Sequence, residues 1–173
     1  MDGLRNHQLQ QQQLNGIMLE TSGRWLVVID LENLLFKAEL LPDAGQIIEV
    51  RLGQEGLASL PASDTPVTMA DGVLTFTNSS NYGTTTVTEL RIYKAKTMTL
   101  SVPEGYAITS IAMTCTASDT TKAGPGCFGA GAPEGYSFAD KQGFWAGEAN
   151  TLSFTATDNQ VRITELTVTI AVL

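Results

Sequence analysis

The stretch Ala107-Ile-Thr-Ser-Ile-Ala-Met-Thr-Cys-Thr-Ala117 decides the fold class, because its side chains alternate in character with a period of two. One set of alternate positions carries Thr109, Ile111, Met113 and Cys115. The positions between them carry Ser110, Ala112, Thr114 and Thr116. This alternation is typical of a β-strand with one face on a core and the other in water. We therefore expect a strand here whose buried face includes Cys115.

A second long strand is predicted at the C-terminus, and its pattern changes phase part-way. The first apolar positions are Val161 and Ile163, and the later ones are Leu166, Val168, Ile170 and Val172. The change of phase near Glu165 indicates a β-bulge or a strand that passes from one sheet to another.

Shorter strands separated by glycine-, proline- and asparagine-containing turns are predicted at 67–70, 73–78, 86–94, 97–102 and 150–157. Regular short strands of this kind are typical of sandwiches and jelly rolls. We predict a mainly β protein, with a jelly-roll-type β sandwich over residues 65–173 and a small N-terminal appendage. The expected core includes Ile111, Met113, Phe154, Ile163 and Val168.

The appendage divides into a polar arm, residues 1–23, and a small subregion, residues 24–60. The glutamine-rich arm is expected to be poorly ordered by itself. In the subregion a strand begins at Arg24, after which Asp30 could cap a helix that ends before Pro42. We prefer strand-helix-strand, although the same leucines also fit two strands. The glycines and prolines of 53–66 indicate a domain boundary there.

The charge content limits the partners. Charged residues are only 16% of the 173, and the net charge is −8 with the basic residues scattered. Nucleic acid and anionic membrane surfaces both attract clustered basic residues, so neither is an expected partner. No apolar run approaches the roughly 20 residues that cross a bilayer, so membrane insertion is not expected.

The N-terminal residues contain no apolar segment of the signal-peptide kind. We nevertheless expect an extracellular or cell-surface location, with a virion component as the alternative. Three explanations stay open: the start of the mature chain has been re-engineered, export uses another route, or the protein is released by other means, as parts of virions are.

Catalysis is not expected, because the only histidine is His7 in the polar arm. The main domain therefore contains no histidine that could act as a general base or as a metal ligand. Two carboxylates close together in a cleft could hydrolyse glycosides. The sequence does not show which of the candidates would lie close together; these are Glu89, Glu134, Asp140 and Glu148. Calcium-loop spacing and a phosphate-binding loop are both missing, so we predict no metal and no cofactor.

Binding is expected near the segment 118–143, which contains six of the sixteen glycines and little strand pattern. Long loops on rigid β scaffolds often carry binding sites. The candidate ligand-binding aromatics are Tyr106, Tyr136, Phe144 and Trp145. Aromatic rings can stack on sugars or anchor protein contacts. The alternative, which we prefer for Trp145, is a place in the core.

Cys115 and Cys127 are the only cysteines, and they flank a glycine- and proline-containing loop. A disulfide between them is one interpretation, and two free thiols is the other.

The stretch Gly143-Phe-Trp-Ala-Gly-Glu-Ala-Asn-Thr-Leu-Ser-Phe-Thr-Ala-Thr-Asp-Asn-Gln-Val-Arg-Ile-Thr-Glu-Leu-Thr-Val-Thr-Ile170 resembles the closing hairpin of β-sandwich modules in secreted and surface proteins of gut Bacteroidota. Glu89-Leu-Arg-Ile-Tyr93, Thr97-Met-Thr-Leu-Ser101 and Ile108-Thr-Ser-Ile111 look like the middle strands of those modules. The resemblance covers about residues 65–173 and implies surface display, adhesion or glycan contact.

Two functions remain as expectations. The first is a non-catalytic binding or assembly protein, an adhesion or structural component of an extracellular or virion-type oligomer, whose partners are further copies of itself or other surface proteins. The alternative is a free-standing carbohydrate-binding module of a Bacteroidota surface protein, with a glycan as its partner.

Overall fold

The computed structural model describes residues 10–14, 17–21, 24–30, 35–41, 45–58, 60–61, 64–79 and 89–173. The chain divides into two compact units, Met1–Gln46 and Ile47–Leu173. The described residues are mainly β-strand, as the sequence predicts.

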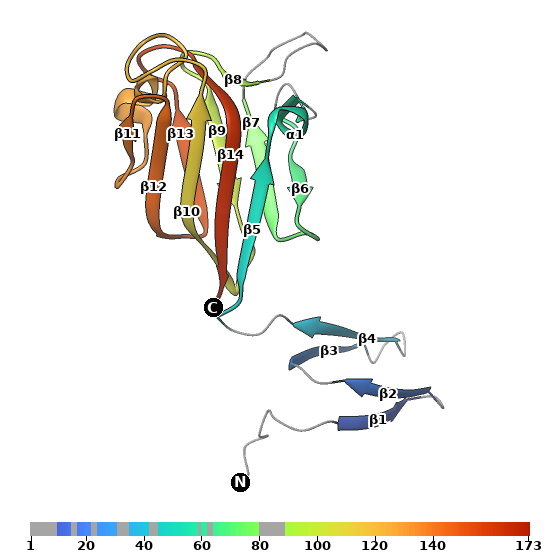
Figure 1. Ribbon diagram of the computed structural model, residues 1–173. Helices are drawn as coiled ribbons and strands as arrows, with labels where there is room; N and C mark the ends of the chain where they lie inside the picture. Colours follow the sequence, from blue (N-terminus) through green and yellow to red (C-terminus); the bar gives the residue numbers. More distant parts are fainter. Residues whose placement is uncertain are drawn as a thin grey trace. The chain divides into compact units, whose positions relative to one another are not determined.

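The first unit contains two separate antiparallel hairpins, labelled in Figure 1. Strand β1 (Gln10–Leu14) pairs with β2 (Ile17–Thr21), and β3 (Arg24–Asp30) pairs with β4 (Leu35–Leu41). A hairpin thus occupies part of the segment expected to be an unordered arm; residues 1–9 lie outside the described residues.

The helix preferred after Asp30 is wrong, and the two-strand alternative is what the structure has. Residues Leu35–Leu41 form β4, which pairs with β3 along its whole length, from Asp30 opposite Leu35 to Arg24 opposite Leu41. The leucine spacing fits a helix or a strand equally, and the β-branched run Val27-Val-Ile29 beside it favours a hairpin.

The second unit is a β sandwich of two antiparallel sheets (Figure 1). The six-stranded sheet has the order β11 (Ser137–Ala139), β12 (Gln142–Ala149), β10 (Tyr106–Cys115), β14 (Val161–Val172) and β5 (Ile47–Leu52), with β8 (Leu90–Ile92) also paired to β14. The four-stranded sheet has the order β13 (Thr151–Thr155), β9 (Thr97–Ser101), β7 (Leu74–Asn78) and β6 (Val67–Met69). The chain crosses between the sheets repeatedly, as it does in Greek-key and jelly-roll sandwiches.

The boundary expected at 53–66 is wrong, because the second unit already begins at Ile47. Strand β5 pairs with β14 from Ile47 to Leu52. The short helix α1 (Gln54–Ala58) then places Leu57 in the core with no exposed surface. Glycine and proline mark a turn-rich connection here and not a linker between domains.

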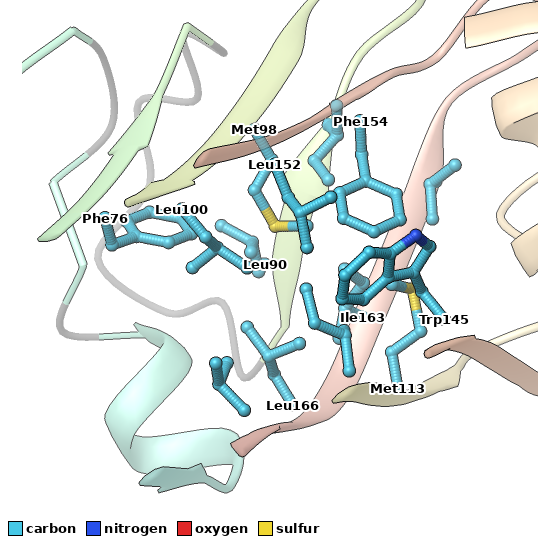
Figure 2. Close-up of a cluster of buried hydrophobic side chains, with 14 of the residues drawn as sticks. Phe76, Leu90, Met98, Leu100, Met113, Trp145, Leu152, Phe154, Ile163 and Leu166 are labelled. Carbon is cyan, nitrogen blue, oxygen red and sulfur yellow. The ribbon is translucent and has the colours of Figure 1, made fainter. Parts of the chain in front are cut away.

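The core lies between the two sheets. Figure 2 shows Phe76, Met98, Leu100, Leu152 and Phe154 of the four-stranded sheet facing Met113, Trp145, Ile163 and Leu166 of the six-stranded sheet. The five predicted core residues, Ile111, Met113, Phe154, Ile163 and Val168, are all at most 1% exposed, which confirms the assigned phase.

Two bulges interrupt the central strand pair β10–β14. Of the two alternatives predicted near Glu165, the structure has the bulge: Thr114 lies opposite Glu165 and Cys115 opposite Ile163, so Thr164 is the extra residue. A second shift between Ile108 and Ser110 makes Thr109 the extra residue on β10. Thr109 is therefore only half-buried and Ile108 takes the core position, which corrects the face predicted for Thr109.

Candidate functional site

The centre of the segment 118–143 is packed onto the sandwich, whereas most of the residues on either side of this centre are exposed. Its centre is the short 3-10 helix η1 (Pro125–Gly131), and residues 123–128 are buried. A Cβ atom at Gly126 would lie 2.8 Å from the ring of Phe138, so glycine allows this ring to cover the segment. The glycines that suggested a flexible loop here permit close packing.

Trp145 belongs to the core, which is the interpretation preferred from the sequence. Its side chain is 6% exposed, and Nε1 donates a hydrogen bond to the carbonyl oxygen of Glu134 at 2.8 Å. A buried indole is expected to find such an acceptor. Trp145 therefore presents no face to a ligand.

Tyr136 is partly buried and its side chain packs against the core cluster. Its ring packs edge-on against Phe128 and Phe154, with ring centroids 5.7 and 5.5 Å away. Its hydroxyl donates to the carbonyl oxygen of Pro125 at 3.1 Å. Burial raises the pKa of this phenol well above its ordinary value. The arrangement is that of a structural tyrosine.

Tyr106 begins β10, is half-buried and packs against the same core. Its backbone carbonyl accepts a hydrogen bond from the side-chain amide of Asn150 at 2.7 Å. The structure thus places Tyr106, Tyr136 and Trp145 in or against the core and does not bring the four predicted aromatics together into one surface cluster.

Phe144 is the one predicted aromatic that is largely exposed, at 46%. Because successive residues of a strand point to opposite faces, Phe144 lies on the outer face of the six-stranded sheet while Trp145 points inward. Its cross-strand neighbours are the small residues Ala112 and Ser137. Small neighbours leave much of the ring exposed on this face.

A row of polar side chains crosses the same outer face beside Phe144. The Thr114 hydroxyl lies 3.2 Å from Glu165 Oε2, and the Gln142 side-chain amide donates to Thr114 Oγ1 at 3.2 Å. Gln142 is two residues from Phe144 on β12, so both point the same way. An exposed ring beside amide and carboxylate groups can make the mixed contacts that sugars need.

Two surface features were missed by the sequence analysis. Phe138 on edge strand β11 is 42% exposed. The second feature, here called the hydroxyl face, is the outer face of the four-stranded sheet, whose outward positions are Thr68, Thr75, Thr77, Thr97, Thr99, Ser101, Thr151, Ser153 and Thr155. Cross-strand hydroxyls meet there, with Thr97 and Thr155 oxygens 2.8 Å apart. The Thr-x-Thr spacing in 75–77 and 97–99 could have predicted a strand face covered with hydroxyl groups.

The two cysteines are free, buried thiols, so the disulfide considered from the sequence is not formed. Cys127 Sγ donates to the carbonyl oxygen of Thr121 at 3.2 Å. Burial, with a smaller contribution from Cys127, raises the pKa of Cys115 to about 12. Such a thiol is unreactive at neutral pH.

The most buried carboxylate among the glycosidase candidates is engaged in an ion-pair network. Glu89 Oε1 accepts hydrogen bonds from Arg91 at 2.9 Å and Arg162 at 3.3 Å, and Glu89 Oε2 accepts one from Thr116 at 2.8 Å. Asp140 instead binds Ser118 and the turn at Asp119. Among the residues that the structure describes, no three metal-ligating side chains gather in one place.

Comparison of the chain with protein-family models, with curated proteins and with solved structures gives no match. The resemblance to Bacteroidota surface modules therefore stays a prediction. No helix in the described part of the chain is both long enough and apolar enough to span a bilayer.

Proposed function

We propose that this chain is a non-catalytic component of an extracellular, cell-surface or virion-type assembly, and that it assembles with further copies of itself. The observation that carries the proposal is the contrast between its two units. The sandwich has its own core between two sheets, whereas the strands described in the first unit form two hairpins that share no sheet.

A two-stranded hairpin alone is only marginally stable in water. Ordering each residue costs about 1–2 kcal/mol of backbone entropy, and a pair of strands offers little buried surface to offset it. The hairpins therefore need contacts from outside themselves. Exchange of such elements between identical subunits is a low-cost route to oligomers, and it agrees with the surface-display role implied by the Bacteroidota resemblance.

The proposal is tested by light scattering on the intact chain and on Ile47–Leu173, which contains the core cluster of the sandwich and is expected to fold alone. We expect the intact chain to have a mass that is a multiple of 18.5 kDa and the sandwich to be a monomer. A monomeric intact chain would rule the proposal out.

Glycan binding is a second candidate, favoured by one observation: the exposed ring of Phe144 beside Gln142 and Thr114 on the outer face of the six-stranded sheet. A glycan array on the intact chain, on Phe144→Ala and on Phe138→Ala tests it. Phe138 is the matched control, because it is a phenylalanine of similar exposure on the neighbouring strand. Glycan signals that Phe144→Ala removes and Phe138→Ala keeps are expected; no signal from the intact chain excludes this function.

A further inference from the structure

The exposed ring of Phe144 and a pocket lie at opposite ends of one line across the six-stranded sheet. Phe144 on β12 is opposite Ala112 on β10. Ala112 is opposite Thr167 on β14, and Thr167 is opposite Arg51 on β5. All four residues are at least partly exposed, and Figure 1 shows their strands side by side. These four residues are here called the cross-strand line.

The pocket lies where β5 ends beside the bulge of β14. Its volume is about 280 Å³, and it is lined by Arg51, Leu52, Gly53, Glu165, Leu166 and Thr167. A Cβ atom at Gly53 would meet nothing within 4 Å, so the glycine leaves this space open. Pockets that hold a whole small molecule measure roughly 300–1,000 Å³, so this pocket suits one unit of a longer ligand.

The cross-strand line sets the distance between the ring and the pocket. Strands β10 and β14 lie between β12 and β5, so the backbones of Phe144 and Arg51 are about 14 Å apart. A ligand that contacts both residues must be longer than a single sugar unit. Ala112 and Thr167 have short side chains, so the middle of the line leaves room for such a ligand.

The charged groups at the pocket offer both hydrogen-bonding roles. Arg51 has only donors and an ionised Glu165 has only acceptors, whereas a sugar hydroxyl both donates and accepts. Arg51 is bound to Glu49, and Glu165 Oε2 lies 3.2 Å from the Thr114 hydroxyl, but both charged side chains remain exposed. Their two charges cancel, and the net charge of −8 on the chain repels an acidic ligand. The pocket therefore favours a neutral ligand rich in hydroxyl groups.

We propose that this face binds a neutral oligosaccharide that runs across the strands, with one sugar ring stacked on Phe144 and another in the pocket beside Arg51 and Glu165. The ring of Phe144 supplies the apolar contact and the pocket supplies the polar ones. This inference rests on glycan binding, the second candidate function above, and adds the class, the direction and the minimum length of the ligand.

Calorimetric titration of the full-length chain with ligands of increasing length tests the inference. The probes are cello-, malto- and manno-oligosaccharides, each from the monosaccharide to the hexasaccharide. We expect one series to bind, with an affinity that rises about tenfold or more between the disaccharide and the tetrasaccharide. Oligogalacturonides of the same lengths, which are acidic, are expected to bind more weakly.

Two threonines of β14 provide matched variants. Thr167→Leu enlarges a side chain on the cross-strand line and at the pocket. Thr169→Leu makes the same change two residues along on the same face, opposite Ser110 and Glu49 and outside the line. We expect Thr167→Leu to weaken tetrasaccharide binding about tenfold and Thr169→Leu to leave it unchanged. Gly53→Leu, which fills the pocket from the other side, is expected to act as Thr167→Leu does.

The following outcomes overturn the inference. If glycans bind through Phe144 with an affinity that does not depend on length, glycan binding stands but does not use the pocket. If Thr167→Leu and Thr169→Leu weaken binding equally, the ligand does not follow the cross-strand line. If Phe144→Ala lowers the mass of the oligomer, the face contacts protein. If neither these probes nor a glycan array gives a signal, the glycan-binding function fails together with the inference.

Discussion

At the scale of single residues, two residues that are adjacent in the sequence can differ sharply in burial. Phe144 and Trp145 both qualify as aromatic binding candidates from the sequence, and strand alternation sends one outward and the other into the core. Sequence could identify the strand, but which phase faces the core depends on the partner strands. The core position of Trp145 could be predicted because tryptophan side chains are highly buried on average.

Trp145→Ala is expected to lower the free energy of unfolding by about 3–5 kcal/mol, because it empties part of the core and leaves the Glu134 carbonyl without its donor. Phe144→Ala, in the same strand, is expected to change it by less than about 1 kcal/mol. Urea unfolding of both variants measures the difference. Equal losses would show that the ring assigned to the outer face is also packed.

The stability of the sandwich is expected to fall at alkaline pH. The pKa of Cys115 is raised from 9.0 to about 12, so the folded state holds its proton where the unfolded state releases it. The stabilisation is thus complete below pH 9 and is lost as pH rises towards 12. Tyr136, whose pKa is also raised by burial, acts in the same direction.

Denaturant unfolding at pH 7, 9 and 10.5 measures this dependence. Cys115→Ala is expected to be less stable at pH 7 but to lose less on going to pH 10.5. If its pH dependence is as steep as that of the wild type, Cys115 is not the titrating group.

At the scale of elements, the sequence predicts a bulge where the alternation of apolar and polar residues is interrupted. The bulge at Thr164 was predictable because apolar positions change phase across it. The bulge at Thr109 was not, because Thr109 and Ser110 are both hydroxylated and the alternation continues undisturbed. Strand β4 forms because it pairs with the neighbouring strand β3, and β5 belongs to the sandwich because it pairs with β14, which is distant in sequence. The local spacing of residues does not encode either pairing.

The hydroxyl face is expected not to take part in assembly. Thr99→Lys replaces one of its central residues, whose hydroxyl lies 3.1 Å from that of Ser153. Loss of one exposed hydrogen bond should cost about 1 kcal/mol or less. Light scattering of this variant is expected to give the wild-type mass, and dissociation would identify the hydroxyl face as an interface.

At the scale of the whole molecule, the fold class and the core of the sandwich could be predicted, whereas the candidate site could be predicted only in part. Of the four aromatics, only Phe144 is largely exposed. The packing of residues 123–128 could not be predicted, because glycine is compatible with both flexibility and close packing. The described strands of the first unit, in turn, form two hairpins that do not join into one sheet, and this arrangement is the basis of the assembly proposal.

The central claim is that contacts between copies order the first unit. Hydrogen exchange of the backbone amides of β3 and β4 tests it most directly, measured on the oligomer and on the monomer obtained by dilution. We predict that these amides are protected in the oligomer and exchange at least about tenfold faster in the monomer, while the amides of β10 and β14 are unchanged. Equal protection of β3 and β4 in both states would contradict the claim.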